Sequence, residues 1–227
     1  MNKLMLNYTL PLTSNIKYGY LYNWFAITDV RYICASGWHI PTHAEYITLG
    51  TYIGGTTYGG TLKETGLTYW DDPNTDATNS NKFNARGGGY RSAAATPALF
   101  YYLKSLGLWW TSTVAVNPDD AQLVLLFFDS GAFNYTLGNN HTKKSGLPVR
   151  LLKDSTTLAH GRTGIYVGND GKIYPTICIG TQEFTSYNLC ETKYRNNDDI
   201  TTVTDGTDWY NLTTEAKCAY NNDLNNI

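Results

Sequence analysis

The stretch GWHIPTHAEYITL, residues 37–49, is the most informative part of this sequence for the fold. Thr42 followed by Glu45 three positions later is the pattern of a capping box, in which each side chain bonds to the other residue's backbone N–H at the start of a helix. Gly54 and Gly55 supply a stop signal. The pattern predicts a helix over residues 42–53.

His39, His43 and Glu45 within this stretch raise the question of a metal or acid-base site. Two histidines four residues apart bind zinc from one face of a helix, but Pro41 separates these two and His39 precedes the predicted helix. Glu45 is already used in the capping box, and the His39 imidazole can bond to nearby backbone. We interpret the group as scaffold. The structural residues that we expect are Trp24, Trp38, His39, Thr42, Glu45, Trp70, Trp109 and Trp110.

The composition is that of a β-rich exterior protein, because charged residues make up 16% of the 227 residues while Tyr (19) and Gly (21) are abundant. A net charge of −2 leaves no basic field for phosphates, so we expect no nucleic-acid partner. The longest apolar stretch, residues 121–133, is interrupted by Asp129 and is shorter than the roughly 20 residues needed to cross a bilayer. We therefore expect no membrane insertion.

Residues 1–15 lack the apolar run and cleavage site of a classical signal peptide. An exterior composition without such a signal fits a protein that is made in a cytoplasm and released by lysis in a virus particle. We expect a location on the virion exterior or an extracellular surface.

The cysteines are Cys34, Cys178, Cys190 and Cys218. They form no CxxC pair and lack the histidine spacing of a zinc site, so they are interpreted as structural thiols. A Cys34–Cys218 disulfide stays open as an alternative, although cytoplasmic assembly argues against it.

The remaining pattern is α+β: small antiparallel sheets with long ordered loops and one or two short helices. The segment 66–91 is too long for an ordinary connection, and its aromatic residues at 69, 70, 83 and 90 predict an ordered loop held in place by buried Trp and Tyr rings. Within it, ARGGGYR (85–91) lacks a phosphate-loop pattern and predicts close backbone packing. We expect Arg86 and Arg91 to be paired or stacked on aromatic rings.

Five motifs carry a family resemblance: YGYLYNWFAI, GWHIPTHAEYITL, GGTLKETGLTYWDDPNTDATNSNKFNARGGGYR, LWWTST and KKSGLPVRLLKD. In this order and spacing, over residues 18–154, they resemble the Fibrobacter succinogenes major paralogous domain. Residues 165–223 resemble the opening part of the same domain, which normally precedes YGYLYNW. Here that part comes last.

The resemblance implies one circularly permuted domain over residues 17–227, in which 17–154 is the usual C-terminal part and 165–227 the usual N-terminal part. The chain ends near NNDLNNI and SNIKYG are then expected side by side. Exchange of the last part between subunits is the alternative. Residues 1–16 show no match to the family, and we interpret them as a docking segment for other virion or surface proteins, or as a disordered start.

The family is similar to C-type-lectin-like proteins, which include formylglycine-generating enzymes and the variable proteins of diversity-generating retroelements. The resemblance implies a C-type-lectin-like fold with ligand contacts on large loops, in a phage-borne version. After LWWTST, aromatic and amide residues lie in or beside predicted turns, as in antibody paratopes. The candidate ligand-binding residues are Tyr90, Asp129, Phe133, Asn134, Tyr135, Asn139, Asn140 and His141. Half-buried strand positions are the alternative for each aromatic residue.

No cofactor is expected, with Ca²⁺ left open. Asp71, Asp72 and Asp76 offer the oxygen ligands that Ca²⁺ takes, but Asp-Pro-Asn is also an ordinary turn sequence and EF-hand spacing is absent. No catalytic residue is expected, because the sequence has no GxSxG elbow and no histidine close to a nucleophile.

The resulting hypothesis is a non-enzymatic display protein on a phage particle or bacterial surface. It would be a homo-oligomer that presents aromatic and Asn-rich loops to a host-surface glycan or protein. A purely structural capsid or fibre decoration protein is the main alternative, and an enzyme of the formylglycine-generating type is the third.

Overall fold

The computed structural model describes residues 16–136 and 138–227, which form an α+β fold of small antiparallel sheets with few helices. The helices are α1 (Trp24–Ile27), α2 (His43–Tyr52) and α3 (Gly206–Tyr210), with 3-10 turns η1 (Thr56–Thr61), η2 (Tyr220–Asn222) and η3 (Leu224–Asn226). The strands before residue 120 are β1 (Leu21–Tyr22), β2 (Trp38–His39), β3 (Gly88–Ser92), β4 (Leu99–Leu103) and β5 (Leu106–Val114). The later strands are β6 (Asp120–Phe127), β7 (Phe133–Asn134), β8 (Asn140–Thr142), β9 (Leu152–Lys153), β10 (Thr163–Val167), β11 (Ile173–Ile179), β12 (Gln182–Thr185) and β13 (Lys217–Cys218).

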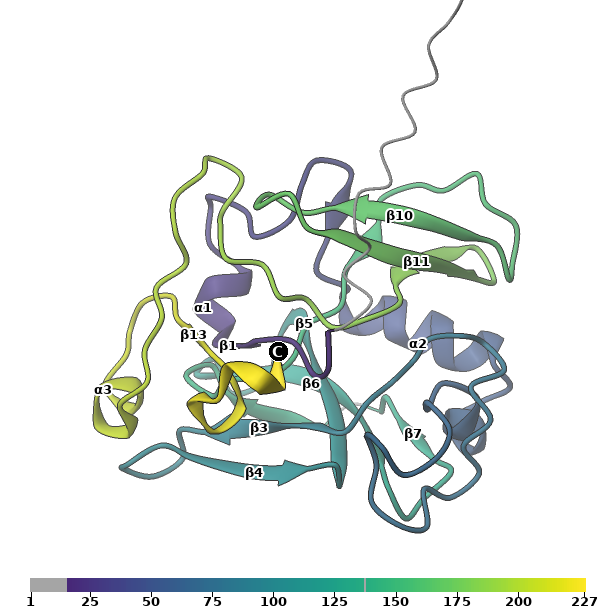
Figure 1. Ribbon diagram of the computed structural model, residues 1–227, viewed down its shortest axis with the longest axis horizontal. Helices are drawn as coiled ribbons and strands as arrows, with labels where there is room; N and C mark the ends of the chain where they lie inside the picture. Colours follow the sequence, from purple (N-terminus) through teal and green to yellow (C-terminus); the bar gives the residue numbers. More distant parts are fainter. Residues whose placement is uncertain (1–15, 137) are drawn as a thin grey trace, which may run out of the picture.

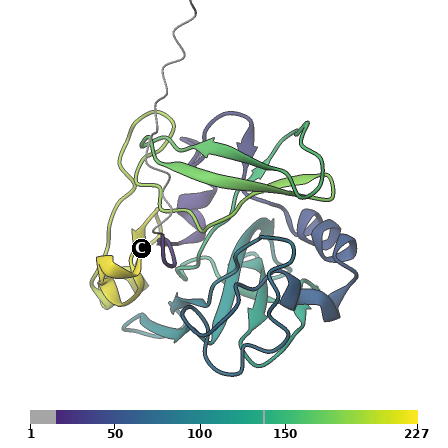
Figure 2. The same ribbon diagram turned by 45° about the vertical axis from the view of Figure 1, so that its right-hand side comes forward.

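Two larger sheets organise the molecule. One is the β5–β6 hairpin with β7 and β8 both paired to β6, and the other has the order β10-β11-β12-β9-β2. Short ladders β3–β4 and β1–β13 complete the fold. In Figures 1 and 2 the β10–β11 hairpin lies at one end of the molecule and β3 to β6 at the other, with α2 at one side.

Helix α2 begins and ends as its sequence predicts. The Thr42 side chain accepts a hydrogen bond from the Glu45 backbone N–H, and Glu45 Oε2 accepts one from the Thr42 backbone N–H at 2.7 Å. The capping box is therefore present. The helix buries Tyr46 and Leu49 against strands of both sheets, which fixes its place in the fold.

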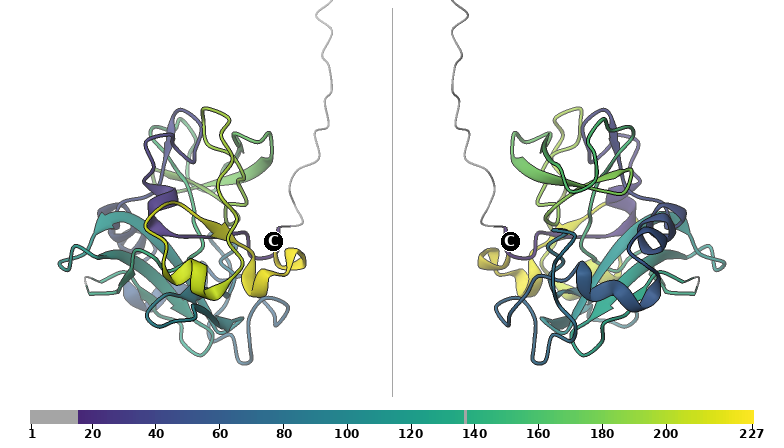
Figure 3. Two further views of the ribbon diagram at one scale, coloured as in Figure 1. Left: turned by 90° about the vertical axis from the view of Figure 1, so that its left-hand side faces the viewer. Right: turned by 90° about the vertical axis from the view of Figure 1, so that its right-hand side faces the viewer.

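The last part of the chain packs on the same chain. Strand β12 pairs with β9 through Phe184 and Leu152, and β13 pairs with β1. The Lys17 backbone N–H donates to the Ile227 carbonyl at 3.0 Å. The C-terminus thus lies beside the start of the described chain, as expected, and Figure 3 shows this proximity from two sides. Whether the order of the two parts is a permutation of the family order stays a prediction.

Four of the five tryptophans expected to be structural are anchored by their indole N–H groups: Trp24, Trp70, Trp109 and Trp110. Trp70, Trp109 and Trp110 are fully buried, and Trp38 nearly so. Their partners are distant in sequence: the Trp109 indole donates to Asn188 Oδ1 and that of Trp110 to the Tyr22 carbonyl. The half-buried Trp24 donates to the Thr111 carbonyl. These bonds let large rings enter the core without leaving a buried donor unpaired.

The segment 66–91 is ordered, as predicted, and its end forms part of β3, but its tyrosines Tyr69 and Tyr90 are half-buried and not buried as expected. Trp70 and Phe83 are buried in the core, and the Trp70 indole donates to the Ala85 carbonyl at 2.9 Å. Arg86 is paired with Glu64 and stacks on the Tyr69 ring, with 3.6 Å between the guanidinium carbon and the ring centroid.

Arg91 lies 4.5 Å from the Trp209 ring centroid and donates to three carbonyls of residues 203–205. The expectation of pairing or stacking is therefore confirmed: Arg86 is both paired and stacked, and Arg91 is stacked.

All four cysteines are buried free thiols, so the structural interpretation is confirmed and the alternative Cys34–Cys218 disulfide is wrong. Their surroundings differ: Cys34 Sγ donates to the Trp38 carbonyl at 2.9 Å, whereas Cys218 lies beside Trp209 in another cluster. Within the described ranges, no helix has the length and apolar character that a bilayer crossing needs.

Candidate functional site

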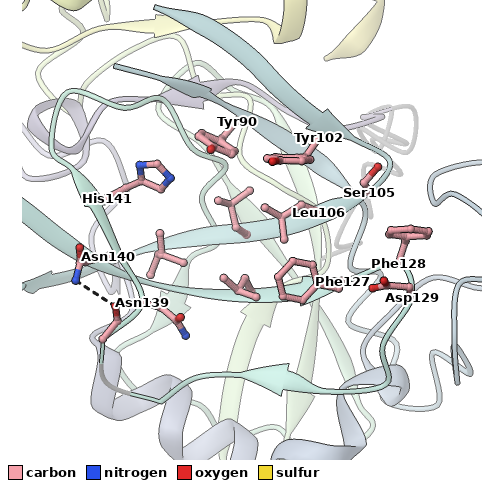
Figure 4. Close-up of a pocket in the computed structure, with 14 residues that line it drawn as sticks. Tyr90, Tyr102, Ser105, Leu106, Phe127, Phe128, Asp129, Asn139, Asn140 and His141 are labelled. Carbon is pink, nitrogen blue, oxygen red and sulfur yellow. Dashed lines mark hydrogen bonds between the residues drawn. The ribbon is translucent and has the colours of Figure 1, made fainter. Parts of the chain in front are cut away.

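A cleft of about 530 Å³ opens over one face of the β5–β6 hairpin and is called the tyrosine pocket here. Its volume falls within the range of small-molecule sites. Figure 4 shows Tyr90, Tyr102 and His141 along one side, Asn139 and Asn140 at one end, and Phe127, Phe128 and Asp129 at the other.

The floor of the tyrosine pocket is aliphatic because of strand alternation. Leu106 and Leu108 of β5 face the cleft together with Leu123 and Leu125 of β6. Successive strand residues point to opposite faces, so the neighbouring Trp109, Val124 and Leu126 enter the core behind the sheet. The floor leucines are themselves largely buried, because Leu106, Leu108 and Leu123 also belong to the other large core cluster.

One wall consists of Tyr90 and Tyr102 of the β3–β4 pair. Together with the neighbouring Tyr101 they are called the tyrosine platform here. Ring centroids are 5.9 Å apart for Tyr90 and Tyr101, and 6.1 Å apart for Tyr90 and Tyr102. Tyr90 and Tyr101 are direct cross-strand partners. Tyr101 and Tyr102 are both exposed. The wall is thus a set of aromatic faces open to solvent.

The rim at the Asn139–His141 end of the pocket is polar and neutral. Asn139 and Asn140 follow a turn at the start of β8, and the Asn140 side chain donates to the Gly138 carbonyl at 3.2 Å. The His141 ring centroid lies 4.6 Å from that of Tyr90. Burial lowers the pKa of His141, so its imidazole is neutral at neutral pH. Asp129 is the single formal charge among the described lining residues.

Five of the eight candidate ligand-binding residues lie together in this pocket: Tyr90, Asp129, Asn139, Asn140 and His141. Phe133 does not, because it is 1% exposed and packs in the core. Tyr135 packs its ring on Phe133 and close to Gly50, and Asn134 pairs with Leu125 at the sheet edge without lining the cleft.

Sequence reasoning missed Tyr102 and the leucine floor. The run AQLVLLFF is apolar at nearly every position, so its pattern does not tell which face of the strand is covered. The pairing of FYYL with GGYR is long-range and has no local signal.

His39 lies between two carboxylates, so the prediction that it bonds to local backbone is wrong. Its Nε2 is 3.0 Å from Glu45 Oε1 and its Nδ1 is 2.6 Å from Asp154 Oδ1. The Glu45 bond, assisted by Asp154, raises the pKa of His39 against the effect of burial. Both ring nitrogens are occupied, so His39 joins β2, α2 and the end of β9 as a structural latch.

His43, by contrast, is buried at the first turn of α2, and burial lowers its pKa. Its backbone N–H donates to Thr113 Oγ1 at 3.0 Å. The two histidines of the opening motif therefore serve separate structural positions.

The calcium candidates are spread along the loop. Asp71 Oδ2 accepts a hydrogen bond from Ser105 Oγ at 2.6 Å, Asp72 is exposed, and Asp76 lies against Gly60 and Gly131. Residues 16–136 and 138–227 contain no group of three or more His, Cys, Asp or Glu side chains arranged to hold a metal ion.

The fold and the cleft define a small α+β domain with an aromatic, solvent-open pocket. The chain belongs to the family of the Fibrobacter succinogenes major domain, whose model matches residues 4–153. No curated protein and no solved structure matches the chain. Residues 4–16 lie within the matched range, so the expectation that residues 1–16 have no family match is wrong for most of that segment. Their proposed docking role concerns residues that, except for Ile16, lie outside the described chain.

Proposed function

We propose that this protein is a non-enzymatic binding protein that holds a neutral glycan of a host surface in its tyrosine pocket. The observation that carries the proposal is the make-up of that pocket: aromatic faces on one wall, an aliphatic floor and amide groups at the rim. Binding sites typically combine an apolar lining with a few polar groups that fix orientation. The C–H faces of a sugar ring can pack on the apolar lining, and its hydroxyl groups can bond to the polar groups.

Charge favours a neutral ligand. Asp129 is the one formally charged group among the described lining residues, and the neutral His141 adds no positive charge. A phosphate or carboxylate ligand would have no cation to pair with, and desolvating it would be costly. A hydroxyl-rich neutral ligand can bond to Asn139, Asn140 and Asp129 without that cost.

The thiols support a non-enzymatic role. Burial raises the pKa of Cys34 and of Cys190 to about 11 each, and that of Cys218 to about 12. Burial also raises the pKa of Cys178. The reactive form of cysteine is the thiolate, and these groups are protonated at neutral pH. An oxidase of the formylglycine-generating type would need an accessible, ionisable thiol.

The proposal places the protein on the outside of a phage particle or bacterial surface, with a C-type-lectin-like fold in permuted order. The low content of charged residues and the wealth of Tyr, Gly and Asn support an exterior setting. Attachment through residues 1–16 and assembly into a homo-oligomer belong to the same proposal. It assigns no role to Ca²⁺.

The test is binding of the labelled protein to an array of immobilised bacterial surface polysaccharides, with Asn140→Ala and with Asn196→Ala as a matched control. Asn196 is also an exposed asparagine but lines none of the hollows around the pocket. We expect neutral glycans to bind the native protein and the control, and Asn140→Ala to lose affinity several-fold. Absence of binding to every glycan by the native protein would contradict the proposal and favour a decoration protein whose cleft is covered in its particle.

A further inference from the structure

The tyrosine platform has a second hollow on its far side. This hollow measures about 260 Å³ and shares Tyr90 and Tyr102 with the tyrosine pocket, while Leu99, Tyr101 and Thr96 belong to it alone. The two hollows are therefore neighbours separated by a ridge of two rings. Leu99, Tyr101 and Tyr102 are exposed apolar side chains that line the second hollow. A clustered patch of this kind marks an interaction site.

The platform depends on an unusual backbone. In a regular strand the side chains of Tyr101 and Tyr102 would point to opposite faces. Here their ring centroids are 6.1 Å apart, and both rings also contact Tyr90. The reason is that Tyr102 has a left-handed conformation, with φ of 61°. A bulky residue in this region costs about 1–3 kcal/mol, and such costs cluster at ligand sites.

Gly89 makes this conformation feasible. It occupies the position opposite Tyr102, between the ladder pairs Gly88–Leu103 and Tyr90–Tyr101, and it also has a positive φ of 56°. A Cβ on Gly89 would lie 2.4 Å from the Tyr101 carbonyl oxygen. Both strands are thus bent at the same point, and the bend brings three tyrosine rings into one cluster.

We propose that the two hollows and the platform between them form one continuous site for the interior of a linear neutral polysaccharide, with several sugar rings bound along the ridge. This inference rests on the proposed glycan-binding function and extends it from a single sugar to a chain. Tyr90 and Tyr102 are stacked with an interplanar angle of 26°, and Tyr101 is tilted by 34° and 39° against them, so the three rings form one compact aromatic cluster. The exposed faces of such a cluster can pack on the C–H faces of successive sugar rings.

The second hollow also lacks charge: no Asp, Glu, Lys or Arg is found among its described lining residues, while Ser92 and Thr96 offer hydroxyl groups. A polar, uncharged chain is therefore compatible with the site from one hollow to the other. A proline-rich peptide is the competing occupant, because aromatic surfaces bind such segments in grooves. The amide rim of the first hollow, which offers hydrogen bonds to hydroxyl groups, favours the sugar chain.

The experiment is native gel electrophoresis of the full chain in gels containing dextran, mannan or arabinogalactan. We expect at least one of these neutral polysaccharides to retard migration. The retardation is then competed with the monosaccharide and the hexasaccharide of the same sugar. We expect the hexasaccharide to compete at least tenfold better. Equal competition by the monosaccharide would overturn the chain inference while leaving single-sugar binding intact.

Tyr102→Gly supplies the matched variant, with Tyr32→Gly as its control. Tyr32 is 56% exposed with φ of 56°, and Tyr102 is 57% exposed with φ of 61°, so both changes remove an exposed ring and relieve the same backbone strain. Neither variant is expected to lose stability. Tyr102→Gly should weaken retardation about tenfold and Tyr32→Gly should not.

A second-hollow variant, Leu99→Ser, distinguishes the two levels of the proposal. Weakened retardation in Leu99→Ser supports the chain. Unchanged retardation in Leu99→Ser, together with loss in Asn140→Ala, would confine binding to the tyrosine pocket and overturn the chain inference alone. If no polysaccharide retards the native protein, or if a ten-residue polyproline peptide binds instead, both the chain inference and the glycan assignment fall.

Discussion

Replacing Arg150 with Met tests the packing of the last part of the chain on the family-matched part. Arg150 is 1% exposed and makes four hydrogen bonds. It donates to Asn188 Oδ1 at 2.7 Å, to the carbonyls of Phe83 and Asn84 at 2.9 Å each, and to the Thr185 carbonyl at 2.8 Å. One guanidinium thus joins the loop 66–91 to strand β12 and the segment behind it.

The expected cost follows from these bonds. Hydrogen bonds to a charged group contribute about 1.5–3 kcal/mol each, but the sum is reduced because Met is far cheaper to bury than a guanidinium. Burial, with a smaller effect of the nearby Arg86 charge, lowers the pKa of Arg150 to about 9, so the site opposes the charge. We expect a net loss of about 3–5 kcal/mol in the free energy of unfolding, since four acceptors lose this donor, although Asn188 Oδ1 keeps the Trp109 indole N–H.

The assay is urea unfolding of the native protein, Arg150→Met and the exposed-site control Arg162→Met. With a denaturant slope of about 2–3 kcal/mol/M, the midpoint of Arg150→Met should fall by about 1.5 M and that of the control by less than about 0.3 M. Hydrogen exchange should rise at residues 83–87 and 182–190. Equal midpoints for the two variants would refute the idea that the guanidinium holds these segments together.

Two further predictions concern the latch and the loop. The pKa of His39 is raised by Glu45 and Asp154, so the stability that it contributes is present below about pH 6.5 and is lost as the pH rises through its folded pKa. Unfolding of His39→Gln should depend less on pH than unfolding of the native protein between pH 6 and 9, and parallel pH profiles would count against the latch. In Gly60→Ala the new Cβ would lie 2.0 Å from the Asp76 carbonyl oxygen. We therefore expect the free energy of unfolding to fall by about 2 kcal/mol or more and the thermal midpoint to fall with it. An unchanged midpoint would show that the loop can shift at little cost.

The helix and the anchored tryptophans could be predicted from the sequence because their signals are local. The capping box needs only Thr42 and Glu45, and both of its bonds are present. The Trp residues are large and apolar, so burial is the default expectation for them. Local chemistry of this kind does not depend on what the rest of the chain does.

The partners of His39 could not be predicted in the same way. Asp154 is 115 residues away in sequence and reaches His39 because β2 pairs with β9. A histidine beside a predicted helix start offers several nearer partners, and sequence alone gives no reason to prefer a distant one. The prediction for Phe133 was wrong for a different reason. An aromatic residue beside a turn was expected to contact a ligand, but Phe133 is buried in the core.

Only part of the candidate site could be predicted from the sequence, for a related reason. The glycines of ARGGGYR were predicted to allow close backbone approach, and Gly89 does so against Tyr101. The clustering of the tyrosine rings also depends on Tyr102, whose backbone conformation is rare for a bulky residue. No sequence pattern predicts this conformation. A side chain that is strained, exposed and ringed by other aromatics is poorly explained by folding alone, because Gly or Asn at position 102 would fold at lower cost. The platform is therefore the part of this protein in which binding, rather than stability, best accounts for the residue.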